Sequence, residues 1–277
     1  MNRAGWWRVA ITVVARLCGF RSKRFLHLVA AAGLLAVCRG GALAQSADVA
    51  NPGIAAPVDY LMPVEDNSII WHLLFDQMEG RTNGPENEFR WDGEGWIGND
   101  MNKIWFKSEG FVEHGVASDG DTEALYDRPI PRMRFFDLQA GVRYDLDSAP
   151  GRTWGAIGIE GLAPYFFEFA PTFYFSDNGR FAGRVTGSYD LLITQRLIAQ
   201  PEFEINFYSK QDPGRGVGSG LSDLDGGLRI RYEVSRKLAP YIGFAYTQTF
   251  GEAAQFTRDE GGIVHDPRFV FGARVWY

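Results

Sequence analysis

Cysteine is almost absent from this chain. The 277 residues include only two, Cys18 and Cys38, and both precede residue 45. The remainder therefore has no disulfide framework, no thiolate metal site and no cysteine nucleophile. Histidine is scarce as well, with four residues in all, so a metal site built from imidazole has few ligands to draw on.

Long hydrophobic runs are missing once the N-terminal region is passed. No stretch of 18 apolar residues occurs after residue 44, which excludes a helical membrane protein. Residues 1–44 carry seven Lys or Arg and no Asp or Glu, and they contain the apolar run Phe25–Cys38 followed by the small residues Ala42–Ala44. This combination predicts a secretory signal peptide over 1–44.

Positive charge is in deficit after residue 44. Without the seven basic residues of 1–44, 21 of the 28 Lys and Arg remain against 34 Asp and Glu, a net charge of −13. Such acidity disfavours nucleic acid as a partner, because phosphates attract Lys and Arg. Residues 45–66 are rich in Pro and Ala and show no periodicity, so we expect a short flexible N-terminal segment there.

Alternation of apolar and polar residues dominates from residue 67 to residue 277. In the run 136–146, Phe136 and Val142 lie on one face of a strand and Arg143 lies on the other. Similar runs cover 167–175, 197–207, 224–234 and 268–277. These runs last 9–11 residues, where a soluble strand has about 5–6. This length suits tilted membrane strands with apolar side chains outward and polar side chains inward.

The expected fold is therefore an all-β, transmembrane, antiparallel up-and-down β-barrel over residues 67–277. Eight clear strand patterns follow residue 133, and four weaker ones lie near 69–79, 91–97, 103–113 and 121–128. Because bacterial barrels have even strand numbers, we expect 12 strands, with 10 as the alternative. A soluble sandwich or lipocalin-like barrel stays open, since alternation alone does not show which face points outward.

The last ten residues, RFVFGARVWY at 268–277, alternate up to a final aromatic residue. Chain ends are usually frayed and polar. A terminal strand of this kind resembles the recognition signal of outer-membrane barrel assembly. We expect it to close the barrel against the first strand, in the outer membrane of a Gram-negative bacterium and in contact with its lipid.

Several collinear stretches together resemble the copper resistance protein B family of Gram-negative outer membranes. They are FDQMEG (75–80), WDGEGWIGNDMNKIWFKSEG (91–110), DLQAGVRYDL (137–146), RTWGAIGIEGLAPYFFE (152–168), LLITQRLIAQPEFEINFY (191–208) and GVGSGLSDLDGGLRIRYE (216–233). The resemblance implies a role in copper resistance and copper ion homeostasis, with copper as the bound or transported ion. It also implies a periplasmic multicopper oxidase as a partner.

One departure from the family pattern concerns the segment that precedes the barrel. Many members carry a Met- and His-rich segment there, whereas residues 45–66 contain one methionine, Met62, and no histidine. The barrel itself is therefore expected to be the functional unit.

Candidate copper ligands are sought among Met and His, because thioether sulfur suits Cu(I) and imidazole suits both oxidation states. On the run 69–79, His72, Asp76 and Met78 have the same parity and are expected to face the lumen. Asp76 and Met78, roughly 7 Å apart along the strand, would then flank one ion. Weak sites suit a conduit, because the ion must also leave. His114 and His265 are expected in loops, and Met101 and Met133 beside strands. The alternative interpretation for all of these side chains is ordinary hydrogen bonding or packing without a metal. The full set of candidate ligands is His72, Asp76, Met78, Met101, His114, Met133 and His265.

Carboxylates are expected to line the lumen. The polar faces hold Asp76, Asp137, Asp145, Glu160, Glu168, Glu202, Glu204, Asp225 and Glu233, interleaved with Arg143, Arg184, Arg229 and Arg231. An acidic lumen favours cations, while ladders of Arg and carboxylate also plug and rigidify a small barrel. The two roles are compatible.

Enzyme motifs are poor. The glycine-rich stretch GRGVGSG at 214–220 lacks the residue order of a phosphate-binding loop, and neither G-x-S-x-G nor H-E-x-x-H occurs. The sequence thus predicts a non-enzymatic outer-membrane barrel, without an organic cofactor, that binds copper ions or passes them across the membrane. A structural or adhesion barrel that does not depend on metal is the alternative, and a lipid hydrolase is a third hypothesis.

Overall fold

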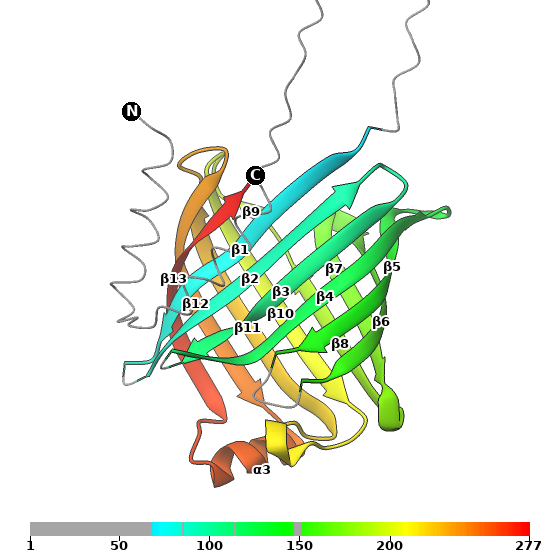
Figure 1. Cartoon of the computed structure of the whole chain (residues 1–277). Coiled ribbons are helices and arrows are strands. Elements are labelled where there is room, and N and C mark those ends of the chain that lie inside the picture. The colour runs from blue at the N-terminus through cyan, green and yellow to red at the C-terminus, as the bar shows by residue number, and fades with distance from the viewer. Residues whose placement is uncertain (1–67, 85, 114, 147–150) are drawn as a thin grey trace, which may run out of the picture. The chain divides into compact units, whose positions relative to one another are not determined.

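The described part of the chain folds into one closed antiparallel β-barrel (Figure 1). The computed structural model describes residues 68–84, 86–113, 115–146 and 151–277; the expected signal peptide, the segment 45–66 and His114 lie outside these residues. The elements in chain order are β1 Ile70–Thr82, β2 Asn87–Gly98, β3 Lys103–Glu113, β4 Val116–Ile130, β5 Met133–Asp145, β6 Thr153–Ala163, η1 Pro164–Phe166, β7 Phe167–Ser176, η2 Asp177–Gly179, β8 Arg180–Ser188, β9 Leu191–Leu192, β10 Leu197–Tyr208, η3 Pro213–Arg215, β11 Gly220–Tyr232, β12 Leu238–Thr249, α3 Gly251–Asp259 and β13 His265–Trp276.

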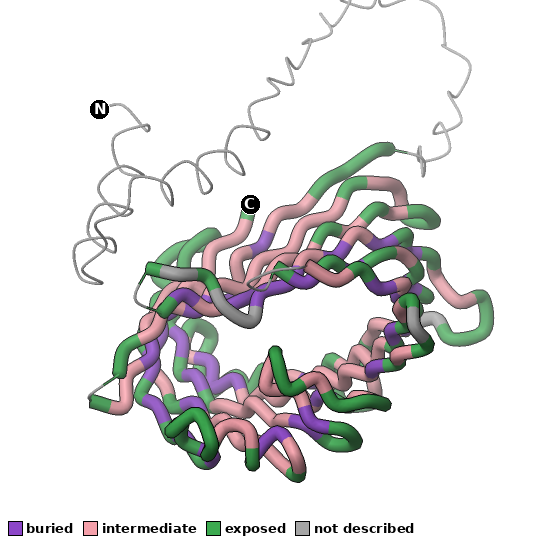
Figure 2. The backbone as a smooth tube through the Cα atoms, turned by 60° about the horizontal axis from the view of Figure 1, so that its bottom comes forward, coloured by how far each residue is buried: buried purple, intermediate pink, exposed green. Residues whose placement is uncertain are grey.

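The sheet has twelve strand positions. Apart from β9, strands that follow one another in sequence pair with each other, and β1 pairs with β13 to close the ring (Figure 2). The two-residue strand β9 pairs with β10 beyond the point where β8 ends, so it prolongs the position of β8. The expected count of 12 strands is confirmed.

The two ends of the barrel differ. At one end, called the terminal end here, β1 begins and β13 finishes; at the other, the helical end, α3 joins β12 to β13 and η3 lies between β10 and β11 (Figure 1). Helix α3 is fastened to the η3 connection by Ser219, whose hydroxyl donates a 2.8 Å hydrogen bond to Glu252 and lowers the pKa of that carboxyl. Among the described residues, no helix is long and apolar enough to cross a membrane.

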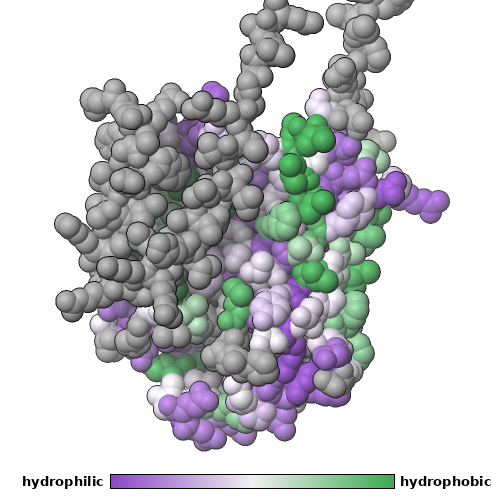
Figure 3. All heavy atoms as spheres, in the orientation of Figure 1, coloured by the Kyte–Doolittle hydropathy of each residue, from purple (hydrophilic) through white to green (hydrophobic). Residues whose placement is uncertain are grey.

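The barrel is apolar outside and charged inside. Val142, Phe173 and Ile242 lie on the outer face with 53, 47 and 58 % of their surface exposed, whereas Glu79 and Arg229 on the inner face are almost completely buried. Figure 3 shows hydrophobic side chains on the visible outer wall and hydrophilic ones toward the lower end. Soluble proteins have the opposite distribution, so the lipocalin-like alternative, with its apolar face inward, is not the fold observed.

The C-terminal strand closes the barrel, as expected. The backbone N–H of Tyr277 donates to the carbonyl of Leu73 at 2.8 Å, and the N–H of Leu73 donates back at 3.2 Å. The Tyr277 ring stacks on Trp71 with centroids 5.2 Å apart and lies under the Lys237 ammonium at 3.5 Å. The last residue therefore fastens the seam between β13 and β1.

Candidate functional site

His72 faces the lumen near the terminal end. Its register partner across β1 and β2 is Trp96, and the two ring centroids lie 6.3 Å apart. Trp96 in turn lies 6.2 Å from Trp105 of β3. The expected inward orientation of His72 is therefore observed, within an aromatic group on the inner wall.

The expectation that Met78 faces the lumen beside Asp76 is wrong. Strand β1 has a β-bulge in which Asp76 has no partner on β2, since Phe75 pairs with Gly93 and Gln77 with Asp92. The extra residue reverses the alternation beyond it. Gln77 and Glu79 consequently point inward and are buried, while Met78 lies between them in sequence and takes the outer face.

Asp76 itself remains in the lumen. Its Oδ1 atom lies 2.9 Å from Nε of Arg274, an inward residue of β13. The carboxylate thus has a partner from the neighbouring strand, and it does not share a site with the Met78 thioether.

The other candidate ligands are dispersed. Met101, in the β2–β3 turn, and Met133, at the start of β5, lie at the terminal end with 53 and 48 % exposed. His265 was expected in a loop, but it opens β13 at the helical end, where its Nδ1 atom is 3.1 Å from the Tyr246 hydroxyl. Within residues 68–84, 86–113, 115–146 and 151–277, no group of three or more His, Cys, Asp or Glu side chains is arranged to hold a metal ion.

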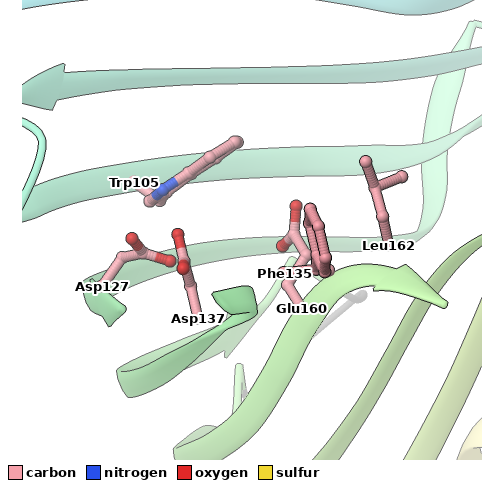
Figure 4. A pocket seen from close by; sticks show the side chains of 7 residues that line it. Trp105, Asp127, Phe135, Asp137, Glu160 and Leu162 are labelled. Carbon is pink, nitrogen blue, oxygen red and sulfur yellow. The ribbon is translucent and has the colours of Figure 1, made fainter. Parts of the chain in front are cut away.

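An acidic pocket opens near the terminal end of the lumen (Figure 4). It has a volume of about 270 Å³ and is lined by Trp105, Asp127, Phe135, Asp137, Glu160, Gly161 and Leu162. Lysines neutralise much of its charge: Nζ of Lys103 lies 3.1 Å from Asp137 and 3.6 Å from Asp127, and Lys107 pairs with Glu160. Two of the predicted lumen carboxylates, Asp137 and Glu160, therefore sit in this pocket with cationic partners.

A layer of ion pairs begins deeper in the lumen at Glu79. This carboxylate accepts hydrogen bonds from Arg81 at 2.8 Å, from Arg229 of β11 at 2.7 Å and from the Tyr241 hydroxyl of β12 at 2.9 Å. Arg229 also pairs with Glu202 of β10. Four strands are thus joined by side chains alone.

Four charged residues at the centre of this layer form a closed ring. Arg90 of β2 and Arg184 of β8 each contact both Glu109 of β3 and Glu204 of β10. Between Arg90 and the two carboxylates the distances are 3.4 and 3.6 Å, and Arg184 Nε lies 3.2 Å from Glu204. We call Arg90, Glu109, Arg184 and Glu204 the four-charge ring.

The layer continues from the ring toward the helical end. Asp121 accepts from Arg184 at 2.9 Å and pairs with Arg143 at 3.1 Å, and Arg143 donates to Asp145 at 2.9 Å. Asp145 also accepts from Arg215 of η3 at 3.2 Å. Asp225 of β11 joins the Glu79 group to the ring, since it pairs with Arg81 at 2.8 Å and with Arg90 at 3.2 Å, so the network of charge pairs is continuous across the lumen.

Seven of the thirteen predicted lumen residues lie in this network, namely Asp145, Glu202, Glu204, Asp225, Arg143, Arg184 and Arg229. The members of the network on β1 to β4 were not predicted. Glu79 and Arg81 follow the bulge in β1, and Asp121 follows the register shift between β3 and β4. Arg90 and Glu109 lie on β2 and β3, which pair with each other without a register shift. The run Lys103–Glu109 does alternate charge with Ile104 and Phe106, and that pattern is the signal that would have identified Glu109 as a lumen residue.

The family model described as Copper resistance protein B precursor (CopB) matches residues 69–277, from β1 through β13. The chain belongs to the copper resistance protein B family. Copper resistance protein B of Escherichia coli is 42 % identical over 214 residues, which cover 77 % of this chain and 72 % of that protein. The Copper resistance protein B homolog of Pseudomonas syringae pv. tomato (strain ATCC BAA-871 / DC3000) is 36 % identical with the same coverage. Membership in the family supports a role in copper resistance.

Solved structures that match this chain include two porins. The NanC porin matches 75 % of this chain and 100 % of its own with a TM-score of 0.49 and 11 % identity. The KdgM porin matches 74 % of this chain and 98 % of its own with a TM-score of 0.44 and 11 % identity.

Proposed function

We propose that this copper resistance protein B family member is an outer-membrane barrel that binds copper ions or passes them across the membrane. The observation that carries the proposal is the family match over the whole barrel, combined with an apolar outer wall and a charged lumen. An apolar wall of long tilted strands suits lipid as its surroundings, and an acidic, hydrogen-bonded interior suits a cation.

Because ion pairs cross its lumen, the barrel is poorly described as a wide diffusion pore. A hydrated ion that passes the four-charge ring must displace protein–protein contacts or find a narrow path beside them. This supports slow, selective handling of an ion. Copper would meet carboxylates and His72 inside the barrel, because the candidate thioethers Met101 and Met133 lie at the terminal rim.

Copper uptake into proteoliposomes that hold the refolded barrel tests the proposal. His72 and Met78 form a matched pair for this purpose, because they lie on the same strand but on opposite faces. We expect His72→Ala to reduce copper uptake and Met78→Ala to leave it unchanged. A Met78→Ala variant that loses uptake while His72→Ala keeps it would place the copper path outside the lumen.

The alternative function, a structural or adhesion barrel independent of metal, predicts no uptake above that of empty liposomes. It also predicts that a deletion strain grows in copper as well as the parent strain. The proposal treats the barrel as non-enzymatic, and the same proteoliposomes, assayed for hydrolysis of a lipid ester, test the hydrolase hypothesis. The multicopper oxidase partner rests on the family resemblance, and affinity co-purification from periplasmic extract with an oxidase activity assay tests it.

A further inference from the structure

The four-charge ring joins opposite walls of the barrel. Going round the sheet, β2 and β3 are adjacent, and β8 and β10 are adjacent. Four strands, β4 to β7, separate the two pairs on one side, and four others, β11 to β13 and β1, separate them on the other. A contact between these pairs therefore spans the full width of the lumen and cannot be an ordinary cross-strand pair.

Arg184 makes most of the contacts across the lumen. From β8 it contacts Glu109 of β3, donates to Asp121 of β4 at 2.9 Å and lies 3.2 Å from Glu204 of β10. Its remaining hydrogen bond goes to Asn206 at 3.1 Å. One guanidinium thus holds three carboxylates from both walls, which its planar fork of five N–H donors permits.

Little solvent reaches the ring, although it lies in the interior of a barrel. The side chains of Arg90, Glu109, Arg184 and Glu204 are 7, 18, 13 and 15 % exposed. Phe111 of β3 closes the layer further, since its ring lies 5.1 Å from the Arg90 guanidinium and 5.2 Å from that of Arg81.

The charge of the ring decides what would pass if it opened. With both arginines in place the ring is neutral, because two guanidinium groups face two carboxylates. Withdrawal of Arg184 leaves Glu109, Asp121 and Glu204 turned toward the vacated space. Carboxylates around a constriction raise the local concentration of cations and repel anions.

We infer that the four-charge ring closes the lumen between the two ends of the barrel and that Arg184 is the residue whose displacement opens a cation-selective path. The inference rests on the proposed function in treating the barrel as a route for ions. It adds the position of the closure and the residue that controls it.

Conductance of the purified barrel in planar bilayers tests the inference, with KCl as the only salt. Wild-type protein is expected to conduct weakly. For Arg184→Ala, K⁺ conductance should rise by on the order of 10-fold, the lower end of the range by which a lining of one charge raises counter-ion concentration. In a tenfold KCl gradient its reversal potential should approach the cation limit of about 59 mV.

Arg231→Ala is the matched control. Arg231 is also an inward arginine, but it donates to Gln200 of the adjacent strand β10 at 2.7 Å and pairs with Asp190 in the β8–β9 connection. Its loss removes a buried charge without removing a contact across the lumen. Conductance of this variant should equal that of the wild type.

Folding of each variant is checked by the shift in gel migration on heating, and Arg184→Gln replaces Arg184→Ala if the latter does not fold. An unchanged conductance in a folded Arg184 variant would overturn the inference, and so would anion selectivity or a wild-type conductance already typical of an open pore. The KCl measurement contains no copper, so it tests the closure even if copper uptake fails.

Discussion

Glu79 shows how a single residue can depend on its whole surroundings. Its carboxylate has no exposed surface and accepts hydrogen bonds from Arg81, Arg229 and Tyr241. Moving a carboxylate out of water costs several kcal/mol unless its oxygens are fully paired. The three donors, from three strands, supply that pairing, so the site is stable only when all of its members are present.

Replacing Glu79 with Gln should therefore destabilise the barrel strongly. The amide keeps the shape of the side chain but leaves two buried guanidinium groups without a shared anion. Breaking a buried pair costs about 3–5 kcal/mol, and we expect the lower end because Arg81 keeps Asp225 and Arg229 keeps Glu202. The free energy of unfolding in urea, measured in lipid vesicles, gives the comparison.

Glu86→Gln is the control for that measurement. Glu86 also pairs with an arginine, Arg268, at 3.4 Å, but its side chain is 56 % exposed. An exposed pair contributes only about 0–1 kcal/mol. Equal losses in the two variants would mean that burial does not govern the strength of these pairs.

At the scale of the strand, the bulge in β1 allows a prediction about single-residue deletions. Asp76 is the additional residue relative to both neighbours, since β1 also gains one residue over β13 between Phe75 and Met78. Deleting Asp76 should restore plain alternation and keep every other residue of β1 on its face. The loss is then one pair with Arg274, in which both side chains keep about a fifth of their surface exposed, so it should be smaller than the loss in Glu79→Gln.

Deleting Phe75 instead should be much more harmful. Asp76 would then take the outward position, and a carboxylate on the outer wall costs up to about 2 kcal/mol when it lies against lipid. The two single-residue deletions have the same length and differ by one position. The fraction of protein in the heat-modifiable, folded form measures the difference, and equal yields would show that the bulge is not located at Asp76.

The alternation of apolar and polar residues predicted the orientation of most side chains on several strands correctly. It assigned the inward and outward faces of β5, β7, β10, β11 and β13, because within those runs no residue interrupts the period of two. It failed for Met78, since one bulge residue reverses every position after it. The short helix α3 was also not expected, because its nine residues are fewer than the window in which a helical period can be recognised.

The contacts across the lumen could not be predicted from local pattern at all. Gln77 donates to Glu202 across 125 residues of sequence, and Arg81 pairs with Asp225 across 144. Such partners are set by the number of strands and by their stagger in the closed ring. The sequence pattern showed which residues face inward, whereas only the closed barrel determines which of them meet.

At the scale of the whole molecule, every contact across the lumen depends on closure of the barrel through β1 and β13. The sequence offers a clean way to test this closure, because both cysteines, Cys18 and Cys38, lie in the expected signal peptide. Met78 and Ala273 are register partners across the seam. Directly opposed Cα atoms in an antiparallel pair are about 4.5–5.5 Å apart, within the range that a disulfide bridges.

The double variant Met78→Cys, Ala273→Cys should therefore form a disulfide between β1 and β13 without added oxidant in the bacterial envelope. Denatured without reductant, the linked chain contains a very large loop and should migrate faster on a gel than the reduced chain.

Met78→Cys with Phe271→Cys is the control, since Phe271 pairs with Gly80 and lies on the diagonal from Met78 at about 7–8 Å, beyond the distance that a disulfide bridges easily. A link only in the control pair would reveal a seam shifted by two residues, and no link in either would mean that β1 and β13 do not close the barrel. The residues of the four-charge ring come from walls that face each other only in a closed twelve-strand barrel. The absence of any link would therefore also rule out closure of the lumen by the four-charge ring.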